Sequence, residues 1–233
     1  AYMNNLTFGI ISDIHGDIDN LKAALNQCNQ HQCDYILLLG DLLNHGPRNG
    51  LPNKYSPMEI AEELNMYKHK IIAIKGNCDS EVDQMLLNFP IKSLYNQFFI
   101  GSHRIFMTHG HKYNEANMNE LNLNKDDIFV YGHTHVTRLE KNENDVIIFN
   151  PGSISFPKQS TLKTMGIIKE NKIKTRVTHH DTKCSNVLFD ENNHGLCVID
   201  LDTVMPGYFI SDVGDIMRTY LSPANEEEKD FSK

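Results

Sequence analysis

Leu6-Thr-Phe-Gly-Ile-Ile-Ser-Asp13-Ile-His15 is an apolar run that ends directly in two polar side chains able to bind a metal ion. Residues 6–12 predict a buried strand. Apolar residues then recur at the helical spacing i, i+3, i+4, i+7, at Leu21, Ala24, Leu25 and Cys28. A second apolar run follows at 35–39. Strand, helix and strand in this order predict a βα unit in a sheet with crossover helices.

The alternation continues and then gives way to strands. We expect helices at 57–67 and 81–87 and a strand at 71–75. From Leu94 onward the expected elements are strands, at 97–100, 104–108, 127–131, 146–149 and 165–169. The Asn-rich stretch 114–124 predicts a surface loop. This order predicts an α/β fold with two packed sheets flanked by helices.

Composition indicates an ordinary soluble globular protein, with 233 residues, 40% of them apolar and 22% charged. No apolar run approaches the roughly 20 residues that span a bilayer, and no secretory leader is visible, so we expect no membrane partner. The five cysteines, at 28, 33, 78, 184 and 197, are odd in number and form no CxxC motif. This argues against a disulfide framework and favours a reducing compartment, so we expect a cytoplasmic location.

The net charge of −8 is unevenly distributed. Residues 1–174 carry 17 Lys+Arg and 19 Asp+Glu, whereas 175–233 carry 5 and 11. The asymmetry supports a junction, and we predict two domains, 1–174 and 175–233. A basic stripe that would follow a phosphate backbone is not present, which argues against sequence-independent nucleic-acid binding, and we expect no sequence-specific nucleic-acid partner.

Polar residues with metal-binding chemistry follow directly on the predicted strands, namely Asp13, Asp41, Asn77, His109 and His133. Ligands in open α/β folds gather at the carboxyl ends of strands. His15 and His135 each lie two positions beyond one of these residues, so both members of each pair can reach one ion. Taken singly, such residues usually cap helices or form turns. Together they predict a site that holds two divalent ions and cleaves phosphoesters.

The motifs that carry these residues resemble those of the calcineurin-like metallophosphoesterases, with DxH at 13–15, GD at 40–41, GN at 76–77, a later His at 109 and GHTH at 132–135. Longer stretches, 40–49, 76–87 and 150–153, resemble the YfcE-type bacterial phosphodiesterases. The resemblance covers residues 6–174. It implies a four-layer αββα sandwich, a small phosphodiester substrate and two divalent ions, most often manganese, with zinc, iron or nickel left open. It also allows a homo-oligomer formed through the strand-rich half.

The resemblance further implies roles for the seven residues. Asp13, His15, Asp41 and His135 would bind one ion, and Asp41, Asn77, His109 and His133 the other, with Asp41 as the bridge. A hydroxide bridging the ions would attack phosphorus in line. The physiological substrate is not readable from the chain.

Cys78 departs from the pattern, because most of the superfamily has a His there that protonates the leaving group. A thiol is a weak donor, so we expect His45 or Asp79 to act as the acid, or the enzyme to prefer esters whose leaving group needs little help. His45 also occupies the place of a phosphate-binding Arg in many related phosphatases. Arg48 is a second candidate to bind substrate phosphate. His111 is a candidate to support the site through a hydrogen bond.

The last 59 residues resemble a different enzyme. Residues 177–189 and 198–202 follow the HxDxxxxN pattern and the later Asp of the aminoglycoside, choline and hexosamine kinase superfamily. The resemblance implies that Asp181 accepts the substrate proton and that Asn186 and Asp200 hold magnesium. Residues 1–174 contain neither the glycine-rich loop nor the strand Lys that a kinase also needs. We therefore expect a short kinase-like appendage, with a hairpin at 187–189 and 196–199 and a helix at 212–220.

Three functions follow from these observations. The first is a metal-dependent phosphodiesterase that rests on residues 13–135. The second is remnant small-molecule kinase activity in the C-terminal segment. The third is a metal-binding scaffold that engages a partner without turnover.

Overall fold

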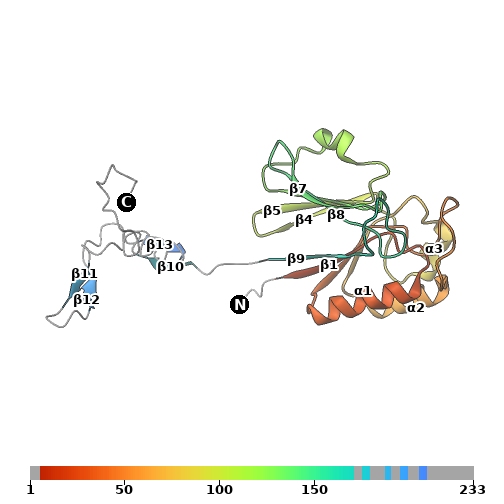
Figure 1. Ribbon diagram of the computed structural model, residues 1–233, viewed down its shortest axis with the longest axis horizontal. Helices are drawn as coiled ribbons and strands as arrows, with labels where there is room; N and C mark the ends of the chain where they lie inside the picture. Colours follow the sequence, from red (N-terminus) through yellow and green to blue (C-terminus); the bar gives the residue numbers. More distant parts are fainter. Residues whose placement is uncertain (1–5, 171–174, 179–186, 190–194, 199–204, 209–233) are drawn as a thin grey trace. The chain divides into compact units, whose positions relative to one another are not determined.

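The computed structural model describes residues 6–170, 175–178, 187–189, 195–198 and 205–208. The chain divides into two compact units, Ala1–Glu170 and Asn171–Lys233 (Figure 1). In the second unit, β10 (Thr175–Thr178) pairs antiparallel with β13 (Met205–Tyr208), and β11 (Val187–Phe189) with β12 (Gly195–Val198). The predicted hairpin is thus confirmed to within one residue. Asp181, Asn186, Asp200 and the helix predicted at 212–220 lie outside the described residues.

The first unit is built on two sheets. The first has the order β3-β2-β1-β9, formed by Ile71–Ala73, Tyr35–Leu38, Thr7–Ile11 and Gly166–Lys169. β1, β2 and β3 are parallel, and β9 is antiparallel to β1. The second sheet has the order β4-β5-β6-β8-β7, formed by Tyr95–Ile100, His103–Thr108, Ile128–Tyr131, Ile147–Pro151 and Thr137–Lys141. Its three central strands are parallel, so they too end at one edge.

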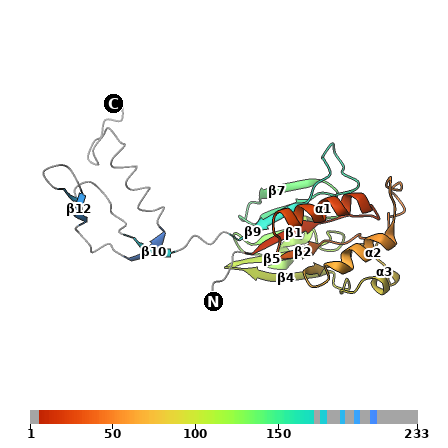
Figure 2. The ribbon, with the colours of Figure 1, turned by 90° about the horizontal axis from the view of Figure 1, so that it is seen from below.

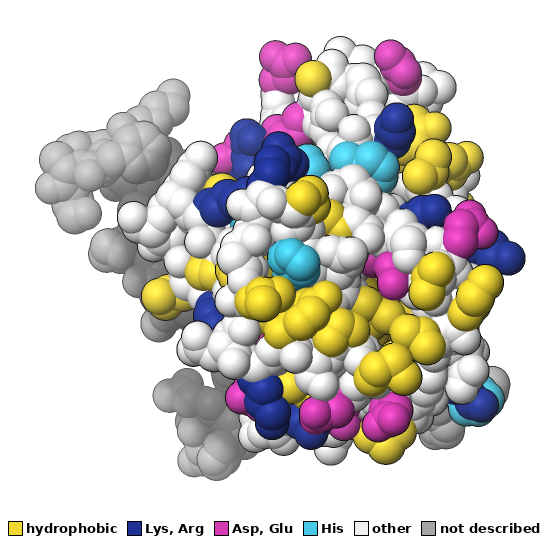
Figure 3. Space-filling view, turned by 90° about the vertical axis from the view of Figure 1, so that its right-hand side faces the viewer, with side chains coloured by type: hydrophobic (Ala, Val, Ile, Leu, Met, Phe, Trp, Pro, Cys, Tyr) yellow, Lys and Arg dark blue, Asp and Glu magenta, His cyan; other side chains and the backbone are white. Residues whose placement is uncertain are grey.

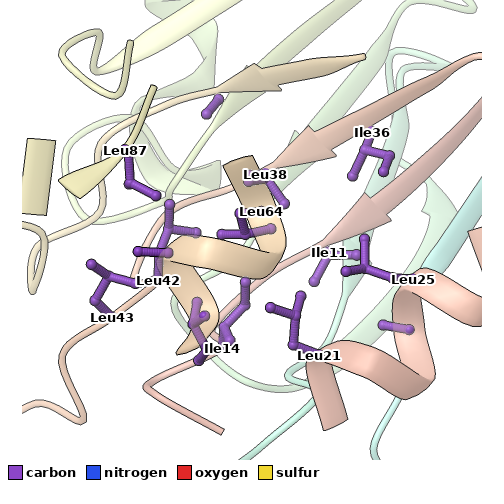
Figure 4. Close-up of a cluster of buried hydrophobic side chains, with 14 of the residues drawn as sticks. Ile11, Ile14, Leu21, Leu25, Ile36, Leu38, Leu42, Leu43, Leu64 and Leu87 are labelled. Carbon is purple, nitrogen blue, oxygen red and sulfur yellow. The ribbon is translucent and has the colours of Figure 1, made fainter. Parts of the chain in front are cut away.

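Helices α1 (Ile18–Gln30) and α2 (Pro57–Met66) cover the outer face of the first sheet (Figure 2). The side chain of Asp17 caps α1 by accepting from the Asn20 amide, and Pro57 begins α2. The buried helix residues pack on the strand residues that face them, a cluster that Figure 4 shows with Leu21, Leu25, Leu64, Ile11, Ile36 and Leu38 labelled. Burial of this apolar stripe holds the βα units in place.

The side chains of β1 alternate, so that Phe8 and Ile10 face the second sheet. They pack there in a cluster with Leu37, Leu39, Ile105, Met107 and Val130. On the far side of the second sheet, Phe129 packs with Met118, which comes from the 3-10 helix η1 (Glu115–Leu121). Helices, sheet, sheet and η1 are the four layers of the predicted α/β αββα sandwich, which is confirmed.

Two local predictions were wrong or incomplete. The stretch predicted as a loop contains η1, because Asn114 caps it through the Ala116 amide and Met118 supplies a buried contact. Strand β7 was not predicted, because all five of its residues are exposed and no apolar alternation marks it.

Helix α3 (Glu81–Leu86) forms as expected and begins with a Ser80/Asp83 capping box. No helix in the described part of the chain is long and apolar enough to span a bilayer.

Candidate metal centre

The seven candidate ligands meet at one edge of the two sheets. Asp13 and His15 follow β1, Asp41 follows β2 and Asn77 follows β3. His109 follows β5, and His133 and His135 follow β6. Because these strands are parallel within each sheet, their carboxyl ends deliver all seven side chains to the same place.

One group of side chains surrounds Asp13. Its Oδ1 lies 3.1 Å from His135 Nε2 and 3.6 Å from His15 Nε2. The two Nε2 atoms are 3.2 Å apart. Asp41 Oδ2 approaches His15 Nε2 to 3.7 Å. These four residues are the set predicted for one ion.

A second group surrounds His109. Its Nε2 lies 3.4 Å from Asp41 Oδ2, 3.0 Å from Asn77 Oδ1 and 3.2 Å from His133 Nδ1. The same oxygen of Asp41 therefore adjoins both groups. The arrangement brings together the two sets predicted from the motifs, with Asp41 between them.

Backbone carbonyls determine which ring nitrogens are free. The Nδ1 atoms of His15, His109 and His135 lie 2.9, 2.7 and 2.7 Å from the carbonyl oxygens of Asn44, Leu39 and Phe156. A carbonyl only accepts, so Nδ1 carries the proton and the Nε2 of a neutral ring presents a lone pair. Asp13 Oδ1 is buried and has no hydrogen-bond partner among the described residues. Converging lone pairs without donors are the arrangement that a cation satisfies, so the residues fit a metal site.

The loops that carry the ligands adopt unusual backbone geometry. Five of the seven candidates have positive φ, namely Asp13 (54°), His15 (49°), Asp41 (55°), His133 (64°) and His135 (61°). Non-glycine residues rarely adopt this left-handed region, and such residues cluster at functional sites. The fold therefore holds these turns against their local preference.

Two glycines make the close approach of the loops possible. A Cβ on Gly76 would lie 2.2 Å from Asp41 Oδ1, and a Cβ on Gly132 would lie 1.9 Å from Ser12 Oγ. Either contact would displace the neighbouring carboxylate or its hydrogen-bond partner. The GN and GHTH motifs thus require glycine for steric reasons.

The electrostatics follow from carboxylates packed against imidazoles. Burial would raise the pKa of Asp13 and Asp41, but the nearby histidines lower both pKa values. Burial would lower the pKa of His109, but Asp41 and Asp13 raise it to about 9. Without a cation, the cluster therefore takes up protons to balance its carboxylates. Divalent ions would replace those protons.

Asp79 lies behind the centre rather than in it. Its Oδ2 accepts from the backbone N–H groups of Asp41 (2.8 Å) and Gly76 (2.7 Å), and its Oδ1 accepts from Leu42 (2.8 Å). The carboxylate is buried and does not line the pocket. This geometry argues against the predicted role as general acid, because both oxygens are occupied in joining two ligand loops.

A pocket of about 490 Å³ opens over the candidate ligands. Residues beyond the ligand set that line it include Asn44, Arg48, Asn49, Cys78 and Lys158. On the face drawn in Figure 3, histidine side chains lie exposed beside Lys and Arg side chains. Lys158 was not predicted, since neither a motif nor a strand end marks it in the sequence. Only the tertiary structure brings its loop to the pocket.

His45 and His111 differ from their predictions. His45 does not line the pocket, and its ring stands edge-on against Tyr55, with 5.4 Å between the ring centroids. Its two predicted roles, proton donation and phosphate binding, therefore stay predictions. The ring of His111 contacts those of His109 and His133, but its Nδ1 has no hydrogen-bond partner in the described residues, and the predicted supporting hydrogen bond is not seen through that atom.

Cys78 lines the pocket at the position where the superfamily usually has a His. Its backbone N–H donates to Asp41 Oδ1 at 2.7 Å. Burial, reinforced by the charge of Asp41, raises the pKa of the thiol to about 12. In the metal-free protein the thiol is therefore protonated at neutral pH, yet it is a weak hydrogen-bond donor.

Residues 6–172 match the calcineurin-like phosphoesterase superfamily domain, and residues 167–229 match the phosphotransferase enzyme family. The chain is 44% identical over 170 residues to phosphodiesterase YfcE of Escherichia coli strain K12, a similarity that covers 73% of this chain and 90% of that protein.

Solved structures agree. A structure of the E. coli phosphoesterase YfcE matches with a TM-score of 0.67 at 35% identity and covers 84% of this chain and 100% of that one. An archaeal phosphodiesterase matches with a TM-score of 0.53 at 25% identity, over 70% of this chain and 93% of that one.

Proposed function

Because the chain belongs to the calcineurin-like phosphoesterase superfamily, we propose that it is a metal-dependent phosphodiesterase whose centre holds two divalent ions. The observation that carries the proposal is the convergence of two ligand groups on one oxygen of Asp41, 3.7 Å from His15 and 3.4 Å from His109. We propose manganese as the metal, while the mixed oxygen and nitrogen donors also suit zinc or iron.

The ions would supply a nucleophilic hydroxide near neutral pH and offset the charge that develops on the phosphoryl oxygens. The protein's own residues would position the ions and the substrate. One ion would be bound by Asp13, His15, Asp41 and His135. The other would be bound by Asn77, His109 and His133, together with the shared Asp41. Backbone carbonyls hold three of the imidazoles in the orientation described above. Arg48, which lines the pocket, would bind a substrate oxygen.

The pocket lacks a strong proton donor for the leaving group among the candidate acids. Asp79 and His45 do not line the pocket, and the candidate acid on its wall, Cys78, is a poor donor. We therefore propose that the enzyme favours diesters whose leaving group departs without a proton. Aryl esters should be cleaved much faster than alkyl esters at equal metal loading.

The test is hydrolysis of bis-p-nitrophenyl phosphate with Mn²⁺, before and after chelation, by the wild type and by Asp41→Asn. We expect turnover that disappears on chelation and falls at least about a hundredfold in Asp41→Asn. A matched control is Asp126→Asn, which alters an exposed carboxylate paired with Lys141. Full activity of Asp41→Asn or of the chelated wild type would refute the proposal. If the protein bound metal but cleaved no ester, the result would favour the third function, a metal-binding scaffold without turnover.

The match of residues 167–229 to the phosphotransferase enzyme family favours a second candidate, remnant kinase activity. We propose Asp181, Asn186 and Asp200 as its residues, on the resemblance of their motif alone. Transfer of phosphate from ATP to an aminoglycoside or choline, lost in Asp181→Asn, would support it. The phosphodiesterase assay does not depend on this outcome.

A further inference from the structure

We propose that the pocket is selective for phosphodiesters whose non-leaving alcohol carries a second anionic group, a carboxylate or a phosphate, which Arg48 and Lys158 recognise. This inference rests on the proposed function and deepens it. Its basis is that, in the described part of the chain, the basic side chains lining the candidate metal pocket lack acidic partners, whereas the lysines of another pocket have them.

Among the described residues, neither Arg48 nor Lys158 is paired with an acidic side chain. Both line the same pocket as the candidate ligands. The lysines of the neighbouring pocket are different, because Lys54 Nζ lies 3.2 Å from Asp19 and Lys163 Nζ lies 3.8 Å from Asp17. The two pocket cations thus remain available to an anionic ligand, whereas the two next to them are neutralised.

The backbones that carry these cations are held in place. The amide of Lys158 donates to the carbonyl of His135 at 3.0 Å, and Thr161 Oγ1 donates to the carbonyl of Lys158 at 2.8 Å. In the other loop, Asn49 Nδ2 donates to the carbonyl of His45 at 2.8 Å, next to Arg48. Lys158 is therefore tied to the loop of a candidate metal ligand. Two cations are thus delivered to one pocket from separate, anchored loops.

Charge balance points to the same conclusion. Two divalent ions would bring four positive charges, of which Asp13, Asp41 and the attacking hydroxide offset three. A simple phosphodiester carries a single negative charge, and Arg48 and Lys158 add two further positive charges at the pocket wall. A second anionic group on the substrate reduces that surplus, and the exposed cations can reach it beyond the scissile phosphate.

Aryl diesters that share one leaving group provide the test. The substrates are four phosphodiesters that share a p-nitrophenyl leaving group and differ in the second ester group. This group is ethyl (neutral), 2-carboxyethyl or 2-phosphoethyl (anionic), or the choline ester (cationic). We expect kcat/KM to be about three- to tenfold higher for the anionic arms than for the neutral arm, and lowest for choline, mainly through KM. The preference should shrink in 0.5 M salt, because exposed charges are screened.

The variants are Arg48→Gln, Lys158→Gln and the double variant, with Lys54→Gln as the matched control and Arg48→Lys as the conservative change. The ratio of anionic to neutral kcat/KM should fall in each Gln variant and approach one in the double variant. It should stay at the wild-type value in Lys54→Gln. A binding measurement independent of turnover compares methylphosphonate with 3-phosphonopropionate by calorimetry on Mn²⁺-loaded protein.

Equal kcat/KM for the neutral and anionic arms would overturn the inference while leaving the phosphodiesterase intact. The inference would also be overturned if the Gln variants lowered kcat/KM for all four substrates by the same factor. If no ester is cleaved, the proposed function fails, and the calorimetric preference for 3-phosphonopropionate, lost in the double variant, decides the inference alone.

Discussion

Asp79 and Asp41 lie 38 positions apart in the chain, yet the carboxylate of Asp79 accepts the backbone N–H of Asp41 at 2.8 Å. The same oxygen accepts the N–H of Gly76 at 2.7 Å. One buried carboxylate therefore joins the loop after β2 to the loop after β3. It sets the distance between the bridging candidate Asp41 and the candidate ligand Asn77.

Asp79→Asn should therefore destabilise the protein and weaken metal binding together. An amide accepts through one oxygen only, so at least one buried N–H loses its partner, which costs roughly 2–3 kcal/mol. Urea unfolding and Mn²⁺ titration calorimetry measure the two effects. Asp83→Ala, which removes the side-chain acceptor of the capping box of α3, should cost about 1 kcal/mol and leave Mn²⁺ affinity unchanged. If Asp79→Asn slowed alkyl esters far more than aryl esters, Asp79 would be an acid after all.

Gly132→Ala should distort the centre, since the added Cβ would lie 1.9 Å from Ser12 Oγ and 2.8 Å from Asp13 Oδ2. We expect a loss of roughly 1–3 kcal/mol in unfolding free energy, with a marked fall in Mn²⁺ affinity. The control is Gly50→Ala, where the new Cβ meets nothing within 4 Å. Unchanged Mn²⁺ affinity in Gly132→Ala would mean that Asp13 does not need its present position.

The stability of the metal-free protein should depend on pH through His109. Folding raises the pKa of this residue from about 6.5 to about 9, so the folded state binds the proton more tightly. The stabilisation is fully present below pH 6.5 and is lost as the pH rises through 9.

Urea unfolding of chelated protein between pH 6 and 9.5 measures this, and His109→Gln should flatten the slope. The exposed His69→Gln should keep it. Saturating Mn²⁺ should reverse the trend, because the metal needs deprotonated ligands.

A carboxylate far from the candidate ligands should control stability at low pH. Burial would raise the pKa of Asp127, but hydrogen bonds from the Asn124 amide and from Arg104 lower it, and Arg104 Nη2 lies 3.0 Å from its Oδ2. The stabilisation is present above pH 4 and is lost as the pH falls through the lowered pKa.

Asp127→Asn should cost roughly 1–3 kcal/mol at pH 7 by equilibrium unfolding and reduce the acid sensitivity. Its neighbour Asp126 is only partly buried and pairs with Lys141, so Asp126→Asn should change little. Equal effects at the two positions would contradict this account.

The sequence by itself determined the layers of the fold and the identity of the candidate ligands. Apolar periodicity at positions such as Ile10, Leu21 and Leu64 predicts strands and helices, because burial imposes a period of two or of 3.6 residues. The same patterns mark where strands end, and parallel strands bring their ends together. Motif positions such as Asp13 and His109 could therefore be assigned to one edge without coordinates. Exposed β7 and the capped helix η1 carry no such period, and both were missed.

Only the tertiary structure decided what each polar residue near the centre contacts. Asp79 and His45 had the right chemistry for a general acid, but one joins two loops and the other stands against Tyr55. Lys158 had no signal in the sequence, yet its loop is tied to that of His135. These outcomes depend on contacts between residues far apart in the chain. Such contacts follow from packing and from left-handed turns that local preference opposes, and neither is encoded in the periodicity of the chain.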